Sequence, residues 1–401
     1  MIANGKTYDA VVVGAGAIGC SLAYHLCIMG QKVALIDSKD IASGSSSHCD
    51  AVVGVASGSL DSLFGRISYD SVRYTAKLAE TFEYDFDCNP KGCIYVFESE
   101  VERELGAKYV EGKHERGMMD YRLIDNYELH ELEPYIAEDL YGGYYCSGKT
   151  SMTVSPYKLC FAFVEEAKKT GNLTVYTYTK ISGIRKNPAT NFIEAIETDK
   201  GTLYTEKIIN CAGIWSNQIG AYVGIELPIY PRKGTILVSE KTKKLCYHKI
   251  FEYGYVASVH PDIKYERKID EEDKPYNIAF NMEYTNDDNI LIGGNRTDTG
   301  DTVSELEVIR AIARRGVRFY PELEKVNCIR SYAGLRPATR DFKPIMSEVP
   351  SVPGFYVCTG HEGSGILSCA MCGKVMAQLV AGEETDYDMS EFSVTRFEQA
   401  S

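Results

Sequence analysis

The segment from Tyr8 to Asp37 constrains the fold more than any other part of the chain. A run of apolar, β-branched residues leads into the pattern G-x-G-x-x-G at residues 14–19. A helical stretch follows, and then a second apolar run that ends at Asp37. Such a strand–turn–helix–strand unit is typical of a parallel sheet whose helix N-terminus faces a pyrophosphate. The segment therefore predicts a dinucleotide site; the alternative is a structural βαβ unit that binds no ligand.

The residues of this segment have separate physical roles. Gly14 permits the tight turn, Gly16 lets the backbone approach a pyrophosphate, and Gly19 lets the helix pack closely on the strand. A carboxylate about 20 residues further on can accept hydrogen bonds from a ribose diol. The residues predicted to hold the dinucleotide here are Gly14, Gly16, Ala17, Ile18, Gly19, Asp37 and Ser38.

A small, hydroxyl-rich stretch follows at residues 38–48. Its serine hydroxyls are suited to donate hydrogen bonds to phosphate oxygens. The alternative is a solvent-exposed loop that leads into a helix cap. Its position directly after the strand that ends at Asp37 favours the phosphate role.

Length and charge exclude several classes of protein. The chain has 401 residues, enough for two domains or for one large domain with an inserted lobe. Its net charge is −13, whereas a nucleic-acid partner needs a basic surface, so we expect no nucleic-acid binding. It has no run of about 18 apolar residues, which predicts no transmembrane segment. No basic region precedes the first strand, so we expect a cytoplasmic protein.

Cysteines and tyrosines are both numerous. The 13 cysteines should mostly be reduced and buried, and the 29 tyrosines should mostly lie in the core or in interfaces. Cys369 and Cys372 form a C-x-x-C at helical spacing, and we interpret them as inert buried thiols. A redox-active pair and half of a metal site are the alternatives. No second C-x-x-C exists, so no metal site is predicted.

The order of predicted elements indicates how the chain is organised. Helical periodicity is clearest at residues 68–84, 98–125 and 304–319. Ser304 is the expected cap of the last of these helices. Residues 228–292 are rich in predicted strands, including an alternating run at Tyr253–Val256. Buried strands return near the C-terminus, which predicts a nucleotide-binding α/β domain that the chain leaves and re-enters.

Four stretches together resemble the family of FAD-dependent amino-acid and amine oxidoreductases. That family includes D-amino-acid oxidase, glycine oxidase, sarcosine oxidase β subunits and hydroxyproline or opine dehydrogenase subunits. The resembling stretches span nearly the whole chain and are residues 14–19 with Asp37, 44–46, 210–216, and 333–341 with 360–366. The first is shared by many nucleotide-binding proteins, whereas the order of all four is specific.

The resemblance implies an α/β fold with a discontinuous, Rossmann-like FAD-binding domain. It also implies a substrate domain built on a large, mostly antiparallel sheet. The FAD-binding domain would comprise residues 1–85, 152–220 and 331–401. The substrate domain would comprise residues 86–151 and 221–330.

The resemblance implies FAD as the cofactor, bound in an extended form. Asp37 would bind the adenosine ribose, Ser45 and Ser46 would approach the phosphates, and the backbone near Ile181 would contact the adenine end. A helix N-terminus near the flavin would stabilise negative charge on the reduced ring. The remaining implied FAD contacts are Ala212, Gly213, Trp215, Arg336, Gly360, His361, Gly363, Ser364, Gly365 and Ile366.

Arg336 is the residue most strongly implied in substrate binding. In the family, the arginine of this G-L-R-P pattern can bind a substrate carboxylate, and a planar guanidinium can hold a carboxylate bidentately. Such a grip would fix the α-carbon over the flavin. The alternative is an internal ion pair, for example with Asp341.

Three further residues are candidates for the active site. Tyr253 and Tyr255 lie where family members place active-site aromatic residues, although ordinary sheet packing is the alternative for both. His361 titrates near neutrality in water, and we expect it beside the flavin as a structural or electrostatic neighbour. We predict no general base, because hydride transfer from the α-carbon can proceed without a strong one.

The chain departs from many relatives at His48-Cys49-Asp50, where an asparagine or alanine and then a glycine usually stand. These polar groups would lie near the flavin. They would alter its potential or allow a covalent link to His48 or Cys49. Release of the flavin by acid precipitation tests the covalent hypothesis.

These observations predict oxidation of an amino acid or a secondary amine. A D-amino acid, glycine, sarcosine or a proline derivative would lose hydride from its α-carbon to flavin and give an imine. One alternative is an FAD-dependent 2-hydroxy acid or glycerol-3-phosphate dehydrogenase. The other is an electron-relay flavoprotein subunit of a larger complex.

Only one dinucleotide fingerprint occurs, because Gly293-Gly294 lacks the spacing of a second. The electrons should therefore pass to oxygen, a quinone, a carrier flavoprotein or a partner subunit.

Overall fold

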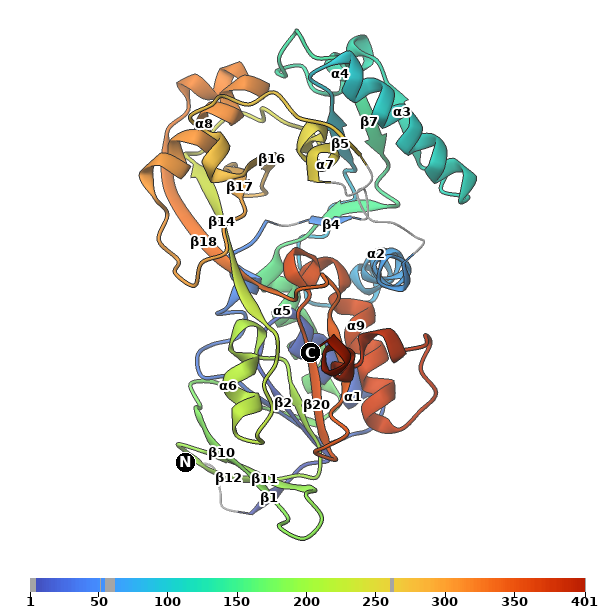
Figure 1. Cartoon of the computed structure of the whole chain (residues 1–401), viewed down its shortest axis with the longest axis vertical. Coiled ribbons are helices and arrows are strands. Elements are labelled where there is room, and N and C mark those ends of the chain that lie inside the picture. Colours follow the sequence, from blue (N-terminus) through green and yellow to red (C-terminus); the bar gives the residue numbers. More distant parts are fainter. Residues whose placement is uncertain (1–4, 51, 55–61, 260–262, 401) are drawn as a thin grey trace.

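The computed structural model describes residues 5–50, 52–54, 62–259 and 263–400. It has two main parts, each built on a sheet (Figure 1). The lower part in that view contains both ends of the described chain and the helices α1 and α9. The upper part contains α3, α4, α7 and α8.

A six-stranded sheet forms the centre of the lower part. Its first strands are β2 (Ala10–Val13) and β3 (Val33–Ile36), which are fully buried and parallel. Their neighbours come from distant parts of the chain. In spatial order the sheet is β19 (Ile345–Glu348), β20 (Phe355–Thr359), β13 (Ile208–Asn210), β2, β3 and β9 (Leu173–Tyr176). All pairs are parallel except β19–β20, as expected for a doubly wound nucleotide-binding sheet.

Helices cover this sheet. The helix α1 (Ala17–Ile28) follows the glycine turn and packs against α5 (Pro156–Lys169) and α9 (Gly365–Ala381). The helix α2 (Leu63–Thr81) also packs on α9, and Ser62 caps its N-terminus. The apolar span from Glu362 to Ala381 is long enough to cross a membrane, but 61% of it is buried inside the fold. Its contacts with α1 and α2 explain its composition as that of a core helix.

The upper part is built on an eight-stranded sheet. In spatial order its strands are β18 (Cys328–Ala338), β14 (Tyr230–Ser239), β17 (Ile290–Asn295), β16 (Ile278–Tyr284), β15 (Lys249–Glu252), β5 (Cys93–Val96), β7 (Gly143–Cys146) and β6 (Tyr121–Ile124), so β18 and β6 are the edges. Only β5 and β15 pair in parallel. Strands β14 and β18 extend toward the lower part (Figure 1).

The helix α8 (Leu306–Phe319) packs on β14, β16 and β17. The helices α3 (Glu100–Glu115), α4 (Asn126–Leu132) and α7 (Tyr253–Val259) lie at the other end of this sheet. The predicted fold class is confirmed: a Rossmann-like part is interrupted in sequence by a part with a large, mostly antiparallel sheet. The proposed domain boundaries stay a prediction, and β18 crosses the one placed at residue 331.

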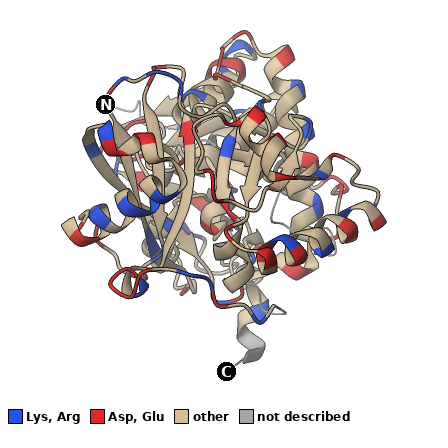
Figure 2. Ribbon diagram, turned by 90° about the horizontal axis from the view of Figure 1, so that it is seen from above, with Lys and Arg blue, Asp and Glu red and all other residues tan. Residues whose placement is uncertain are grey.

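Two smaller sheets complete the structure. One contains β1 (Lys6–Thr7), β12 (Gly201–Tyr204), β11 (Ile193–Thr198) and β10 (Ile181–Lys186). The other pairs β4 (Val52–Gly54) with β8 (Ser151–Thr153). The short helix α6 (Ser216–Ala221) follows β13. Seen from above, acidic and basic residues alternate along the ribbon of the outer helices and loops (Figure 2).

The structure corrects three predicted elements. Tyr253–Val256 is not a strand but the first part of α7, where Tyr253 and Ala257 are buried at the i, i+4 spacing of a helix. A four-residue window cannot distinguish this pattern from alternation. The helix α8 is preceded by Glu305 rather than capped by Ser304. The helix predicted at 98–125 ends at Glu115, and the edge strand β6 follows it.

Candidate active site

One large cavity lies at the carboxyl ends of the parallel strands, where ligands bind in open α/β sheets. Its volume is about 520 Å³. Its wall combines the glycine turn and the serine-rich stretch after β3 with residues of β14, β17 and β18 and the loop before α9. Both sheets therefore contribute to one site.

The glycine turn has the geometry that the sequence predicted. Gly14 has a φ of 104°, and a Cβ there would lie 2.5 Å from the carbonyl oxygen of Cys211. A Cβ on Gly19 would lie 1.9 Å from the carbonyl oxygen of Gly14, so α1 packs directly on the turn. Gly19 therefore has a packing role and does not line the cavity. Gly16, Ala17 and Ile18 do line it.

Asp37 is held rigidly at the cavity wall. Its carboxylate accepts hydrogen bonds from the backbone N–H groups of Ala15 and Lys39, each at 2.8 Å. Each carboxylate oxygen retains a lone pair for another donor. This arrangement suits a carboxylate that binds ribose hydroxyls. Ser38 lines the cavity beside it.

Both predicted serines line the cavity, but each already has a partner. Ser46 Oγ accepts a hydrogen bond of 3.0 Å from the backbone N–H of Ala17, at the start of α1. Ser45 Oγ donates to the carbonyl oxygen of Leu335 in β18. The serine-rich stretch thus joins the glycine turn to the second sheet.

The predicted adenine end also lines the cavity. Ile181 lies there with Ala212, Gly213 and Trp215. The Trp215 side chain is 43% exposed, and its ring packs 3.2 Å from the position of a Cβ on Gly44.

The predicted flavin end is formed by the loop after β20. His361, Gly363, Gly365 and Ile366 line the cavity, whereas Gly360 and Ser364 do not. A Cβ on Gly360 would lie 2.7 Å from Cγ2 of Thr339, so this glycine is needed for packing behind the wall.

His361 is buried, and burial lowers its pKa to about 3. Its imidazole is therefore neutral at physiological pH, and it supplies no positive charge to the site. Its Nε2 atom is buried without a hydrogen-bond partner among the described residues. An unpaired buried polar atom in a cavity wall is typical of a site whose ligand supplies the partner.

Arg336 projects into the cavity beside this loop. Its Nη1 donates to the carbonyl oxygens of Lys233 and Asn295, each at 3.3 Å. Gly234 makes room for it, because a Cβ there would lie 2.3 Å from Nη2. Among the described residues, no carboxylate forms an ion pair with Arg336 within 4.0 Å. Burial lowers the pKa of Arg336, and nearby Glu362 opposes that change.

The alternative role proposed for Arg336 is wrong. Asp341 pairs instead with Arg396, whose Nε lies 2.7 Å from Oδ2 of Asp341. The guanidinium of Arg336 therefore keeps unused N–H donors that face the cavity.

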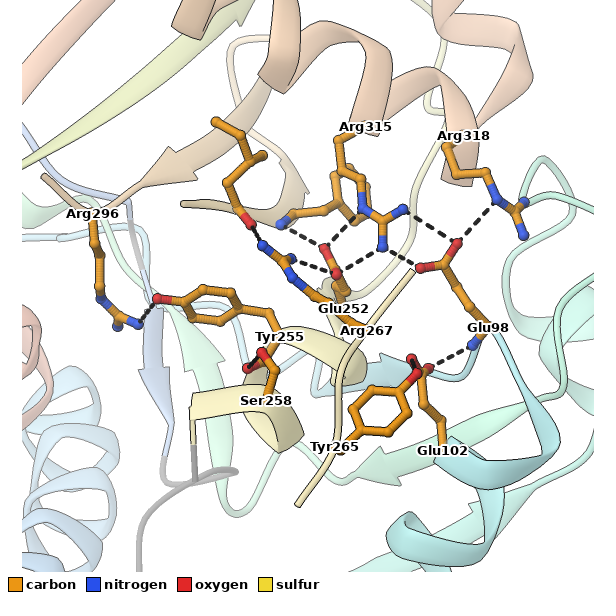
Figure 3. Close-up of polar contacts among 12 residues, drawn as sticks. Glu98, Glu102, Glu252, Tyr255, Ser258, Tyr265, Arg267, Arg296, Arg315 and Arg318 are labelled. Carbon is orange, nitrogen blue, oxygen red and sulfur yellow. Dashed lines mark hydrogen bonds and ion pairs between the residues drawn. The ribbon is translucent and has the colours of Figure 1, made fainter. Parts of the chain in front are cut away.

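The two tyrosines lie in different surroundings, and neither lines the cavity. Tyr253 is buried among the aromatic rings of Phe97 and Tyr144, so its role is core packing. The hydroxyl of Tyr255 accepts a hydrogen bond of 2.7 Å from Nη1 of Arg296 (Figure 3).

Sequence reasoning missed Arg296 and Glu362. Glu362 lines the cavity next to His361, and its Oε1 lies 3.7 Å from Nε of Arg296. Glu362 lies in the loop that the sequence analysis placed at the flavin. Its negative charge in that loop was the only sequence feature that could have marked it as a site residue. Arg296 directly follows the buried strand β17, but its approach to residues 336 and 362 depends on long-range folding.

A buried ion-pair network lies behind Tyr255 (Figure 3). Glu252 accepts hydrogen bonds of 2.7 Å from Arg315 and from Arg267. Although burial favours the neutral carboxyl, these two arginines hold the pKa of Glu252 below its ordinary value. The guanidinium of Arg267 also lies 4.9 Å from the centre of the Tyr255 ring. Tyr255 is thus held between Arg267 and Arg296.

His48, Cys49 and Asp50 all line the cavity, near the predicted flavin position. Burial raises the pKa of the Cys49 thiol, which disfavours a reactive thiolate. Asp50 pairs with the fully buried Lys249 at 3.1 Å. Lys249 also lies 3.3 Å from Glu283. A covalent flavin link at His48 or Cys49 stays a prediction.

The C-x-x-C thiols are inert by their surroundings. Cys369 and Cys372 are both buried in α9, and burial raises both pKa values, that of Cys372 to about 12. In the described part of the chain, no group of three or more His, Cys, Asp or Glu is placed to hold a metal ion.

Comparison with known proteins identifies the family. Residues 9–379 match the family described as DAO, FAD dependent oxidoreductase. The chain belongs to this family. It is an enzyme, an FAD-dependent oxidoreductase, and the glycine turn, Asp37 and the unpaired His361 nitrogen fit that cofactor. When bound there, FAD supplies the acceptor for a hydride.

Three relatives are similar over most of this chain. Glycine oxidase of Geobacillus kaustophilus is 26% identical over 97% of each chain, and its crystal structure superposes with a TM-score of 0.83 over 98% of this chain and 99% of that one. Hydrogen cyanide synthase subunit HcnC of Pseudomonas aeruginosa is 26% identical over 98% of this chain and 97% of its own length. Glycerol 3-phosphate dehydrogenase of Caloramator mitchellensis is 26% identical over 90% of this chain and 71% of its own length.

Proposed function

We propose that this enzyme oxidises an amino acid or a secondary amine whose carboxylate is bound by Arg336. The observation that carries this proposal is the guanidinium of Arg336. It lies in the cofactor cavity, has no carboxylate partner among the described residues, and keeps unused donors. A substrate carboxylate would supply the missing negative charge and bind the planar fork of N–H groups.

The reaction balances as a two-electron oxidation. The Cα–H bond would break and its hydrogen would leave as hydride, for which bound FAD would supply the acceptor. The nitrogen lone pair would form the C=N bond of an iminium ion, its N–H proton would pass to water to give the imine, and a second water would hydrolyse the imine to a carbonyl compound and an amine. An oxidant, either oxygen or an electron carrier, must afterwards accept the two electrons.

The role of this chain is mainly to position the substrate. Arg336 would fix the carboxylate and thereby the α-carbon. The neutral imidazole of His361 would offer a hydrogen-bonding atom in the wall without adding charge. If the substrate amine binds in its neutral form, the reaction needs no strong base on the enzyme. This agrees with the prediction that the site has no general base.

One relative supports the amine substrate, and another supports the alternative of a glycerol-3-phosphate dehydrogenase. Glycine oxidase is named for an amino acid, whereas the Caloramator relative is named for glycerol 3-phosphate. A phosphate substrate would need several unpaired basic groups. Arg232 is close to the site but is already bound by Asp298 at 2.7 Å, and Glu362 adds a negative charge. Among the described residues, Arg336 is the only arginine of the cavity wall, which favours a carboxylate over a phosphate.

HcnC is named as a subunit, which motivates a partner or carrier protein as the electron acceptor. A free flavoprotein that turns over at full rate with oxygen as the only acceptor would contradict this part of the proposal.

The test is an anaerobic titration of the purified protein. The panel comprises glycine, sarcosine, L-proline, D-amino acids, hydroxy acids and glycerol 3-phosphate, and bleaching of the oxidised flavin band is followed. Bleaching by an amine is expected. Bleaching by a hydroxy compound alone would overturn the proposal and favour a 2-hydroxy acid or glycerol-3-phosphate dehydrogenase. No bleaching despite bound flavin would favour an electron-relay subunit. Admission of air then separates an oxidase from a dehydrogenase.

A further inference from the structure

We propose that Arg296 forms a second anion site, and that the preferred substrate carries a second carboxylate beside the oxidised amine. This inference rests on the proposed function, in which Arg336 binds the first carboxylate. It assigns the chemical class of the substrate as an amino acid with a carboxylate-bearing substituent.

The two arginines lie against the same short loop. Arg296 Nε is 3.7 Å from Oε1 of Glu362. Arg336 Cδ is 3.5 Å from the position of a Cβ on Gly363, the next residue. Arg336 also donates to the carbonyl oxygen of Asn295, the residue before Arg296. Arg296 is not itself in the cavity wall, but it contacts Glu362 of the wall, so a small molecule bound to Arg336 would lie near it.

Most N–H donors of the Arg296 guanidinium have no hydrogen-bond acceptor among the described residues. Within the described part of the chain, its only hydrogen bond goes to the hydroxyl of Tyr255, at 2.7 Å. The distance to Glu362 is too long for a hydrogen bond. Its side chain is 38% exposed, so a ligand can reach it. An arginine has five N–H donors, and most of those on Arg296 are free.

Arg232 lies near the same loop, but its guanidinium donors already have protein partners. It is also near Glu362, at 3.9 Å. Its Nε and Nη2 donate to Asp298 at 2.7 and 3.3 Å, and Nη2 donates to the hydroxyl of Tyr230 at 2.9 Å. Arg232 is thus a structural residue, and the contrast identifies Arg296 as the arginine that is kept for a ligand.

Tyr255 and the network behind it hold Arg296 in position (Figure 3). The ring of Tyr255 lies between the guanidinium groups of Arg267 and Arg296, 4.9 and 5.3 Å from its centre. Arg267 is fixed by Glu252, which is fully buried. A guanidinium held in this way loses little conformational entropy when it binds an anion.

The test compares two unreactive ethers that mimic one-carboxylate and two-carboxylate amines. Methoxyacetate and diglycolate are titrated into the FAD-bound enzyme, and binding is read from the perturbed flavin spectrum. The wild type should bind diglycolate about 10- to 100-fold more tightly, as expected for one additional charge-assisted contact. Equal affinities would overturn the inference, and this comparison requires no variant.

Variants then assign the preference to a residue. In Arg296→Gln the preference should disappear, while the affinity for methoxyacetate should stay within about threefold. Arg330→Gln is the control, because Arg330 is exposed on the same strand as Arg336 and its loss changes the net charge equally. A preference that survives in Arg296→Gln would overturn the assignment. Tyr255→Phe should reduce the preference only in part, because the charge remains.

The two proposals fail in different ways. If Arg336→Gln leaves the binding of both ethers unchanged, the proposed function fails. If Arg336→Gln weakens both ethers but the wild type does not distinguish them, only the second anion site fails.

Discussion

The proposed function depends on one residue, Arg336. Its half-buried guanidinium donates to backbone carbonyl groups of the cavity wall, and among the described residues no carboxylate lies within 4.0 Å of it. A buried charge without an opposite charge is costly unless a ligand compensates it. The unpaired guanidinium of Arg336 therefore destabilises the free enzyme, and binding of a substrate carboxylate would reduce this unfavourable energy.

Replacement of Arg336 by Lys should lower kcat/KM by about 100-fold for whichever amine bleaches the flavin. The positive charge remains, but the bidentate geometry that orients the α-carbon is lost. Steady-state kinetics and the bound FAD content provide the measurement. Arg330→Lys is the matched control. Unchanged kcat/KM with full FAD content would show that Arg336 does not orient the substrate.

Asp37 acts on the cofactor rather than on the substrate. Asp37→Asn should weaken FAD binding by about 10- to 100-fold. A carboxylate has two oxygen acceptors, whereas a carboxamide has one oxygen acceptor and an NH2 group that only donates. Quenching of flavin fluorescence on adding FAD to the apoprotein measures the dissociation constant. The exposed Asp40→Asn on the same loop is the control and should leave FAD affinity unchanged. Equal affinities in both variants would argue against a ribose contact.

At the scale of elements, the contact between α3 and α7 contains an unusual carboxyl group. Glu102 is buried, and burial raises its pKa to about 7, although the backbone N–H of Glu98 and the hydroxyl of Tyr265 donate to it at 2.7 Å (Figure 3). A Cβ on Gly254 would lie 2.3 Å from its Oε1, so α7 packs directly against this carboxyl.

This carboxyl makes stability depend on pH with a defined sign. The folded chain binds a proton more tightly at Glu102 than the unfolded chain does. The free energy of unfolding should therefore fall as pH rises from about 4.5 to about 7, by up to about 3 kcal/mol. Denaturant unfolding of Glu102→Gln across that range should lack this component. The exposed Glu104→Gln on the same helix should retain it. Identical pH profiles in the two variants would contradict the argument.

At the scale of the whole molecule, the cavity joins the two main sheets. Its wall includes the ends of β2, β3 and β20 and the residue after β13 from one sheet, and residues of β14 and β18 from the other. No single segment forms the site, and its members lie more than three hundred residues apart in the chain, from Gly14 to Ile366.

FAD should therefore stabilise both sheets together. At an FAD concentration of about 100 times its dissociation constant, the free energy of unfolding should rise by about 2.7 kcal/mol. Thermal unfolding with and without FAD measures the gain, and hydrogen exchange locates it. Protection should increase in β2 and β13 and also in β14 and β18. Protection confined to the first group would show that the large sheet does not contact the cofactor.

The sequence by itself determined the parts of the protein that local chemistry specifies. The glycine turn follows from residues 14–19, because only residues without a Cβ fit the contacts with residues 14 and 211. Buried parallel strands follow from continuous apolar runs, and the return of such a run near residue 355 indicated that the nucleotide-binding part is discontinuous. These signals lie within short windows, so a single sequence is enough to read them.

The tertiary structure alone decided which charged residues meet. Arg296, Arg336 and Glu362 come from separate elements, and no local pattern indicates that Glu362 lies near both arginines. The structure also made Tyr253 a core residue in a helix, paired Asp341 with Arg396 and thereby excluded the alternative pair with Arg336, and fixed Tyr255 between two arginines. The physical reason is that electrostatic interactions depend on distance in space and on burial. Both are set by how β14, β17 and β18 pack against the loop before α9.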